Sequence, residues 1–521
     1  MKMQIMIKSL LEDLNKYVKA MQENSENAKQ FSDLFRENYM SLKEEQQLDD
    51  FYERLWSEFS SDPKIFTLIL SIIYDVVRDD RSLYEIFYLL QHSDMDLLSQ
   101  IYIRDQLETC IFRNSNLSRN YRNRRNLHKQ LLTKLENLID VNLDYKPYKF
   151  RNKKRIVLTI CQLLGDSHAP TRVLKEICYI LQNKFHYEVL VIVAIDDMYD
   201  GDLSSIWYHP AISFYNENYN GSFTVKYKEE KINGFQFIMN HRNLGIIKKL
   251  INIICNYNPA FIWHMGNRCL FADLFRKYTT VMAMPFTDGY TISEAQIMCT
   301  YLNSHSDEIK DMEAYLGETG QKPLQYDLRL PLTPSMKTYH RKDFNIDDKD
   351  FVITVVGNRL DIEVNNEFKQ LLRKILKISS KISIAFVGIF ESYPSFINED
   401  EIFSTRTKFL GYQEDLIGVL GIMDLFLNPP RQGGGGGAVY SLYNGVPVVT
   451  LNYCDVANSL EPEDTCNSIQ EMFGLIQKYF YDKVFYQKQS VKALEIRKKR
   501  GLDVFFNNTK TMLEEAVELF E

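Results

Sequence analysis

Five consecutive glycines at positions 433–437 are the residues of this sequence that most directly suggest chemistry. They lie between a short apolar segment, residues 424–430, and a helical pattern that begins at Ala438. Glycine loses more backbone freedom on ordering than any other residue, and a slack linker is not expected inside a strand–helix unit, where connections are short. Exposed backbone N–H groups ahead of a helix form an anion site, so we expect a phosphate or diphosphate there. A tight turn without a ligand is the alternative, which explains one or two glycines better than five.

Three further residues carry a charge or a titratable ring and lie in loops that follow predicted strands. Arg359 follows an apolar strand pattern, and its guanidinium suits phosphate because it offers fixed, bidentate donors; a structural ion pair is the alternative. His168 lies in the loop after another predicted strand and could accept a proton or bind a phosphate, or merely cap the next helix. Asp166 beside it is a second carboxylate candidate, with an N-cap role as the alternative.

The other candidates follow predicted strands, where parallel sheets bind their ligands. Ligand contacts on the acceptor side are predicted for His264, Asn267, Arg268 and Asp288. Donor contacts are predicted for Asn358 and Tyr412, with turn formation as the alternative.

The apolar patterns that must position these residues divide the chain into four parts. Residues 1–148 show helical spacing throughout and predict an all-α N-terminal domain that could bind an acceptor or partner. Strand–helix–strand patterns then predict two tandem, doubly wound α/β domains, residues 149–335 on the acceptor side and 336–500 on the nucleotide side. The pattern in residues 501–521 predicts a C-terminal helix, which we expect to pack back on the first of these domains. The cleft between two such sheets is the expected site.

Composition excludes several classes of protein. The 521 residues carry a net charge of −7, which argues against a general nucleic-acid binder. No apolar run is long enough to span a membrane, and the N-terminal segment is too charged for a signal peptide. The eight cysteines are scattered without a CxxC pair. We therefore expect reduced, mostly buried thiols in a cytoplasmic protein, with neither a disulfide framework nor a zinc site.

Two charged segments allow more than one interpretation. The basic run at 113–130 is either a solvated helix face or a docking patch for an acidic partner. Asp200 and Asp202 lie in an acidic loop, "IDDMYDGD". This loop resembles the Asp-x-Asp signature that binds a metal and a diphosphate in one fold of glycosyltransferases. Short acidic loops after strands are common, however, and the two-domain layout argues against that fold.

The order of motifs in residues 350–455 resembles the nucleotide-binding half of GT-B glycosyltransferases. The matching segments are "FVITVVGNRL", "KISIAFVGIF" and "GGGGGAVYSLYNGVPVVTL". The resemblance implies two Rossmann-like domains, a sugar-nucleotide donor, and Arg359 as the cation on the diphosphate. The paired glutamates of retaining members would fall on Gln432 and Tyr440, neither of which is a carboxylate. The lysine that commonly follows Arg359 is also absent, since residues 361–363 are Asp-Ile-Glu.

A narrower resemblance fits these departures. "GDSHAPTRVL" (165–174) is similar to the "G-x-H-P-T" loop of the O-GlcNAc transferase-like family, which includes bacterial adhesin glucosyltransferases. "WHMGNRCLFADLF" (263–275) stands where that family has an "M-G-x-x-G" loop. The family implies inverting transfer to protein without a bound metal or cofactor, a donor such as UDP-glucose or UDP-GlcNAc, and possible homo-oligomers. The predicted catalytic residues are His168, Asp166 and Arg359. The predicted donor-binding residues are Asn358, Arg359, Tyr412, Gln432, Gly433, Gly434, Gly435, Gly436, Gly437 and Tyr440.

Two other functions remain open from the sequence. The missing carboxylates would also fit a degenerate GT-B subunit that binds acceptor protein and assists a catalytic partner, although such a subunit has no reason to keep five glycines and Arg359. A phosphorylase-like or epimerase enzyme acting on small sugars is the more distant alternative.

Overall fold

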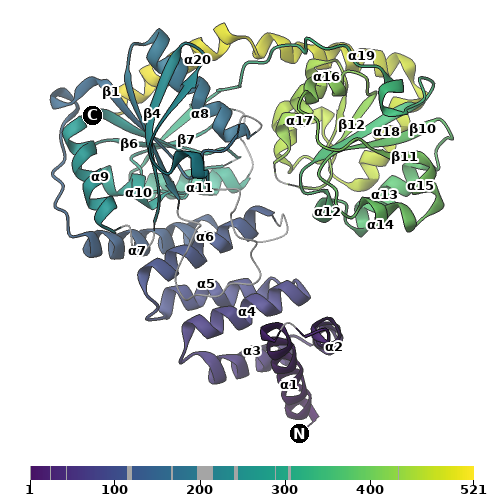
Figure 1. The fold of residues 1–521 in the computed structure, drawn as a ribbon, viewed down its shortest axis with the longest axis horizontal. Helices are drawn as coiled ribbons and strands as arrows, with labels where there is room; N and C mark the ends of the chain where they lie inside the picture. The colour runs from purple at the N-terminus through teal and green to yellow at the C-terminus, as the bar shows by residue number, and fades with distance from the viewer. Residues whose placement is uncertain are drawn as a thin grey trace.

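The computed structural model describes residues 2–23, 25–42, 44–113, 120–165, 168–195, 215–239, 244–287, 289–302, 307–431 and 433–520. It confirms an all-helical N-terminal region followed by two Rossmann-like α/β domains, which lie side by side in Figure 1. Among the described residues, no helix combines the length and the apolar character that crossing a membrane requires.

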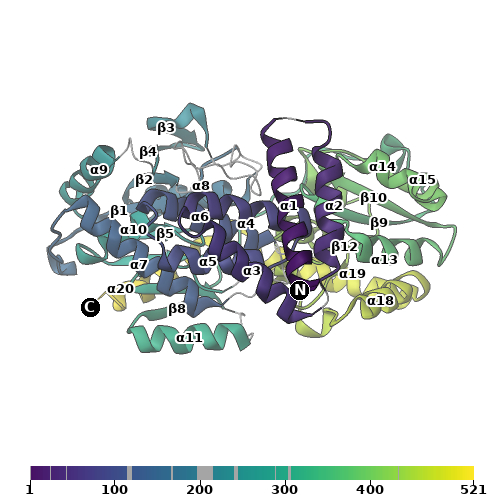
Figure 2. The same ribbon diagram turned by 90° about the horizontal axis from the view of Figure 1, so that it is seen from below.

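The N-terminal helices stack in a row that leads away from the first α/β domain (Figure 1), as the view from below also shows (Figure 2). Their bounds are α1 Lys2–Gln22, α2 Ala28–Met40, α3 Glu45–Phe59, α4 Pro63–Val77, α5 Arg81–His92, α6 Leu97–Arg113 and α7 Tyr121–Ile139.

The first α/β domain is built on a sheet with strand order β3-β4-β2-β1-β5-β6-β7-β8 in the described residues. Its strands pair in parallel except β3 with β4. The strands are β1 Asn152–Ile160, β2 Glu188–Ile195, β3 Gly221–Tyr227, β4 Glu230–Ile238, β5 Pro259–Met265, β6 Val281–Met284, β7 Ile297–Tyr301 and β8 Lys322–Tyr326. The helices are α8 Ala169–Tyr179, α9 Leu244–Tyr257, α10 Leu270–Asp273 and α11 Asp307–Thr319.

The second α/β domain has the parallel strand order β11-β10-β9-β12-β13. The strands are β9 Phe351–Gly357, β10 Ile382–Gly388, β11 Thr407–Phe409, β12 Leu425–Leu427 and β13 Val448–Val449. The helices are α12 Leu360–Glu363, α13 Asn366–Leu376, α14 Tyr393–Asn398, α15 Glu401–Arg406, α16 Leu416–Leu420, α17 Gly435–Tyr443, α18 Ile469–Tyr481 and α19 Lys483–Leu494. The last helix, α20 (Leu502–Glu518), returns to the first domain (Figure 1).

The two faces of the first sheet bury different partners. Side chains alternate across a strand, so Val157 of β1 joins a core that runs on into the N-terminal helices, whereas Ile156 and Leu158 join the core on the opposite face. Phe505 and Met512 of α20 belong to that second core. The N-terminal helices are therefore continuous with the first α/β domain in their hydrophobic packing.

Buried charges reinforce the contact between the N-terminal helices and the first α/β domain. Nη1 of Arg104 lies 2.8 Å from Nδ1 of His128. Because a guanidinium can only donate, Nδ1 is the acceptor and the ring proton is on Nε2. Nε2 donates to Asp273 at 2.6 Å. Burial raises the pKa of Asp273, but hydrogen bonds from His128, Ser293 and the Glu294 amide outweigh it and hold that pKa below its usual range.

The basic run at 113–130 contributes to the same contact. Arg122 pairs with Glu318 at 2.6 Å, Arg124 with Glu108 at 2.9 Å and the buried Arg125 with Glu294 at 2.6 Å. Arg124 and Arg125 are thus engaged within the chain, whereas Arg122 and Glu318 form a solvent-exposed pair. The docking patch stays a prediction. Residues 114–119 lie outside the described residues.

Removing one partner of the buried network should be costly. We expect Asp273→Ala to lower the free energy of unfolding by about 3–5 kcal/mol, because it leaves His128 and Ser293 buried without their acceptor. Urea denaturation followed by circular dichroism measures this. Glu318→Ala, which breaks an exposed pair, should leave the midpoint unchanged. Equal effects of the two substitutions would show that the buried network does not stabilise the interface.

Candidate functional site

The glycine run follows β12 and has two halves: Gly433 and Gly434 form the turn, whereas Gly435–Gly437 already belong to α17, which begins three residues before the predicted start at Ala438. Gly433 and Gly434 have φ angles of +85°, the left-handed region that favours glycine. A Cβ at Gly434 would also lie 2.5 Å from the Arg431 guanidinium. By contrast, a Cβ at Gly435 or Gly436 would meet nothing within 4 Å. The first half is thus needed for the fold, while the second half leaves open space at the N-terminus of α17.

A buried guanidinium holds the first half of the turn in place. Arg431 donates to Asn428 Oδ1 at 2.9 Å, to Glu363 Oε2 at 2.5 Å and to the Val356 carbonyl at 2.6 Å. Burial lowers the pKa of Arg431, and the Glu363 carboxylate opposes that effect. The Gly433 amide, in turn, donates to Asp455 at 2.6 Å.

The carboxyl ends of β9 and β10 adjoin this guanidinium. A Cβ at Gly357 would lie 2.6 Å from Arg431, and a Cβ at Gly388 would lie 2.0 Å from the Gly357 carbonyl oxygen. Arg359, just after β9, pairs with Glu363 at 3.0 Å and keeps 29% of its side chain exposed. Glu363 therefore bridges Arg359 and Arg431, so the structural ion pair considered for Arg359 exists alongside its partial exposure.

The first domain meets the glycine turn through α8. Arg172 of α8 donates to the hydroxyl of Tyr440 on α17, and its guanidinium carbon lies 5.9 Å from the Tyr440 ring centroid. In Figure 1, α8 and α17 face each other between the two sheets. Arg172 stands one turn after His168, the residue that precedes α8. The structure thus places the histidine loop of the first domain and the glycine turn of the second domain next to the boundary at which α8 contacts α17.

Thr171 sets the orientation of the His168 ring. Its hydroxyl oxygen accepts from the Leu164 amide at 2.9 Å and lies 2.9 Å from Nδ1 of His168. That oxygen has two lone pairs, so it can also accept from Nδ1–H, the tautomer that leaves a lone pair on Nε2. Burial lowers the pKa of His168 to about 4. The ring is consequently neutral near pH 7.

The predicted acceptor-side residues have other partners within the chain. His264 is fully buried. Asn267 bonds the Thr287 hydroxyl at 3.0 Å and the Phe286 amide at 3.2 Å, which positions the following loop. Arg268 pairs with Asp105 of α6 at 2.8 Å. The prediction of direct acceptor contacts stays untested, but these three side chains are engaged in holding the first domain together.

The remaining predicted residues divide into exposed and undescribed ones. Asn358 and Tyr412 are exposed beyond the ends of β9 and β11. Asp166, Asp288 and Gln432 lie outside the described residues, as does the acidic loop with Asp200 and Asp202. Sequence reasoning missed Arg172, although it lies within the histidine motif, and Arg431, which directly precedes the turn.

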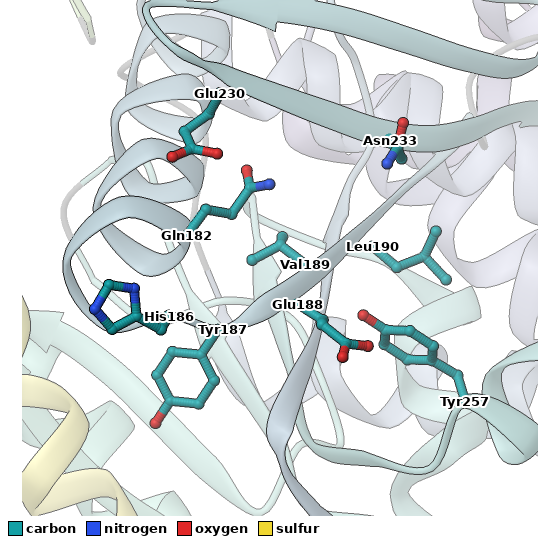
Figure 3. Close-up of a pocket in the computed structure, with 9 residues that line it drawn as sticks. All are labelled: Gln182, His186, Tyr187, Glu188, Val189, Leu190, Glu230, Asn233 and Tyr257. Carbon is teal, nitrogen blue, oxygen red and sulfur yellow. The ribbon is translucent and has the colours of Figure 1, made fainter.

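A separate cavity of about 510 Å³ lies at the opposite edge of the first sheet. Figure 3 shows its lining around the start of β2, with Glu188, Tyr257 and Glu230. These residues stand at the amino ends of parallel strands. Ligands of such sheets bind at the carboxyl ends, so this cavity is not the candidate site.

Comparison with known proteins supports the architecture. No protein-family model matches the sequence, and no curated protein resembles it significantly. The chain is similar to a mutant O-GlcNAc transferase from Thermobaculum terrenum, with 13% identity over 100% of this chain and 98% of that chain, at a TM-score of 0.56.

Weaker likenesses are HepE of Anabaena in complex with UDP and a glycosyltransferase from Rickettsia africae. HepE shares 13% identity over 69% of this chain and 100% of its own, at a TM-score of 0.46. The Rickettsia protein shares 12% identity over 70% of this chain and 99% of its own, at a TM-score of 0.47. The similarity to the Thermobaculum structure extends over the helical region and both α/β domains, and it shows that the chain has the GT-B fold.

Proposed function

We propose that the protein is a glycosyltransferase that moves a sugar from a UDP-linked donor to a protein or peptide acceptor. One observation carries the proposal: the glycine turn has open space over Gly435 and Gly436, at the N-terminus of α17. Helix N-termini with exposed N–H groups favour phosphate. The turn also lies at the side of the second domain that contacts α8.

The second domain can stabilise the leaving diphosphate. Preorganised donors aimed at developing charge lower the barrier most where they need no rearrangement. The turn packs against the buried Arg431 guanidinium at Gly434, and its Gly433 amide donates to Asp455, so we propose that the following amides are preorganised. Arg359 adds a partly exposed cation near the end of β9. We therefore propose departure of the nucleotide without a metal at the diphosphate.

The first domain can activate the acceptor. His168 is neutral near pH 7 and oriented by Thr171, as a general base requires. Asp166, two residues earlier in the sequence, remains a second candidate. Position 440 carries a phenol held by Arg172 where retaining relatives are expected to have a carboxylate. We infer inversion at the anomeric carbon, with direct attack by the acceptor.

The acceptor class rests on the helical region. The O-GlcNAc transferase from Thermobaculum matches this chain over its whole length, including the N-terminal helices. These helices share a core with the first domain, so they are rigidly attached beside the acceptor side. We propose that they present a polypeptide, and that the donor is UDP-glucose or UDP-GlcNAc.

An assisting, non-catalytic subunit is the second candidate. The same Arg172–Tyr440 contact also fits this function, because it engages the side chain at a position where retaining relatives are expected to carry a carboxylate. Donor binding without any release of UDP, in the presence of acceptor protein, would support this function over catalysis.

Substitutions at two glycines of the run should separate an effect on donor binding from an effect on folding. Gly436→Ala places a methyl group in open space, so we expect unchanged stability but at least about tenfold weaker UDP-sugar binding by calorimetry, or about 1.4 kcal/mol. Gly434→Ala is the matched control for the fold, and its left-handed backbone alone should cost about 1–2 kcal/mol of stability.

The donor experiment has two unfavourable outcomes. If the unaltered protein binds no nucleotide sugar, it is not a glycosyltransferase. If Gly436→Ala binds the donor as tightly as the unaltered protein, the diphosphate does not lie over this turn.

Replacing His168 should affect the rate of turnover rather than the binding of the donor. We expect His168→Ala to lower kcat by about 100-fold or more while donor affinity changes little. Because a base must be deprotonated, kcat/KM of the unaltered enzyme should fall only as pH drops through about 4, the lowered pKa of His168. An acid limb near the ordinary histidine value, or one that persists in His168→Ala, would assign the base to another residue.

A further inference from the structure

Two cysteines and a histidine meet at the carboxyl ends of β1 and β5. Cys161 directly follows β1, His264 lies within β5, and Cys269 is the N-cap residue of α10. Their ligand atoms all lie within 4.8 Å of one another. His264 and Cys269 are fully buried, while Cys161 is partly accessible. Buried thiols and an imidazole at this separation need only a small contraction to share one ion.

The histidine ring is held with one nitrogen aimed at the thiols. Thr159 and His264 are cross-strand partners, and the Thr159 hydroxyl lies 3.0 Å from Nδ1. Nε2 is buried, and its neighbour is the Cys269 thiol, which interacts with the ring. Metal-binding histidines show this pattern, because an outer hydrogen bond to one nitrogen orients the other toward the metal.

The backbone beside the cluster leaves room around Nε2. Gly266 has a φ angle of +147°, and a Cβ there would lie 3.4 Å from Nε2 and 3.9 Å from the Cys161 sulfur. A side chain at this position would therefore fill the space next to two of the three ligand atoms. The Cys161 thiol meanwhile donates to the Arg268 carbonyl at 2.9 Å, an interaction that a thiolate would give up.

We propose that Cys161 Sγ, Cys269 Sγ and His264 Nε2 bind a zinc ion, with a fourth position left for water. Thiolate and imidazole ligands suit Zn²⁺, whereas Mg²⁺ and Ca²⁺ require oxygen ligands, which this cluster lacks. Binding releases the thiol protons and involves no change of oxidation state.

The position of the cluster indicates a structural role next to the candidate site. The loop that leads to His168 begins at Cys161, and Arg268, which pairs with Asp105 of α6, directly precedes Cys269. A metal there would tie the histidine loop to the segment that contacts the N-terminal helices. The proposal does not depend on the proposed glycosyltransferase activity, because it concerns neither the glycine turn nor the donor.

Cobalt substitution tests the site on the intact chain. Protein that has been reduced, stripped with a chelator and titrated anaerobically with Co²⁺ should bind one ion per chain and gain thiolate-to-cobalt charge-transfer absorption. Added Zn²⁺ should abolish that absorption. Cys269→Ser and His264→Asn should lose the bound ion. Cys255→Ser, which alters a partly accessible cysteine of α9 in the same domain, should keep it.

The following outcomes would overturn the proposal, and none of them depends on a variant that fails to fold. Failure of the unaltered protein to bind Co²⁺, or binding of Co²⁺ without thiolate absorption, would overturn it. A Cys161–Cys269 disulfide found by mass spectrometry in metal-free protein as isolated would replace the zinc site. Retention of the ion by a folded Cys269→Ser variant would place the metal elsewhere.

Discussion

The burial of the Arg431 guanidinium is the constraint on which the second domain's candidate site depends. A buried charge is tolerated only where it is paired and hydrogen-bonded, and Arg431 meets this condition with Glu363, Asn428 and the Val356 carbonyl. These partners lie at the ends of β9 and β12 and in α12. The guanidinium thereby joins two strand ends to the glycine turn, and neighbouring backbone must approach it closely. Gly357 and Gly434 are glycines for this reason.

The same pairing determines what the site can offer a ligand. Glu363 is shared between Arg431 and Arg359, so one carboxylate faces two cations. Arg359 keeps part of its side chain exposed, and a Cβ at Gly435 or Gly436 would meet nothing within 4 Å. The fold thus leaves open space at the N-terminus of α17 and a partly exposed cation after β9.

Sequence patterns predicted the parts of the structure that local physics controls. Strand and helix spacing indicated two parallel-sheet domains behind a helical region, and the glycine run indicated a turn before α17. Contacts between distant segments could not be read in the same way. Nothing around Arg172 shows that it reaches Tyr440, and the basic run gave no sign of its partners Glu294 and Glu318. The sequence spacing of Cys161 and Cys269 likewise gives no sign of their proximity, because they come together through the pairing of β1 with β5.

The two α/β domains differ in how they are supported, and this bears on catalysis. The first shares a core with the N-terminal helices, whereas the second has cores formed by its own elements. Domains with separate cores can move relative to each other. The Arg172–Tyr440 contact crosses the boundary at which the proposed function brings His168 and the glycine turn together. Because the proposed transfer needs both groups at one anomeric carbon, and in-line geometry tolerates little displacement, this polar contact is well placed to set their separation.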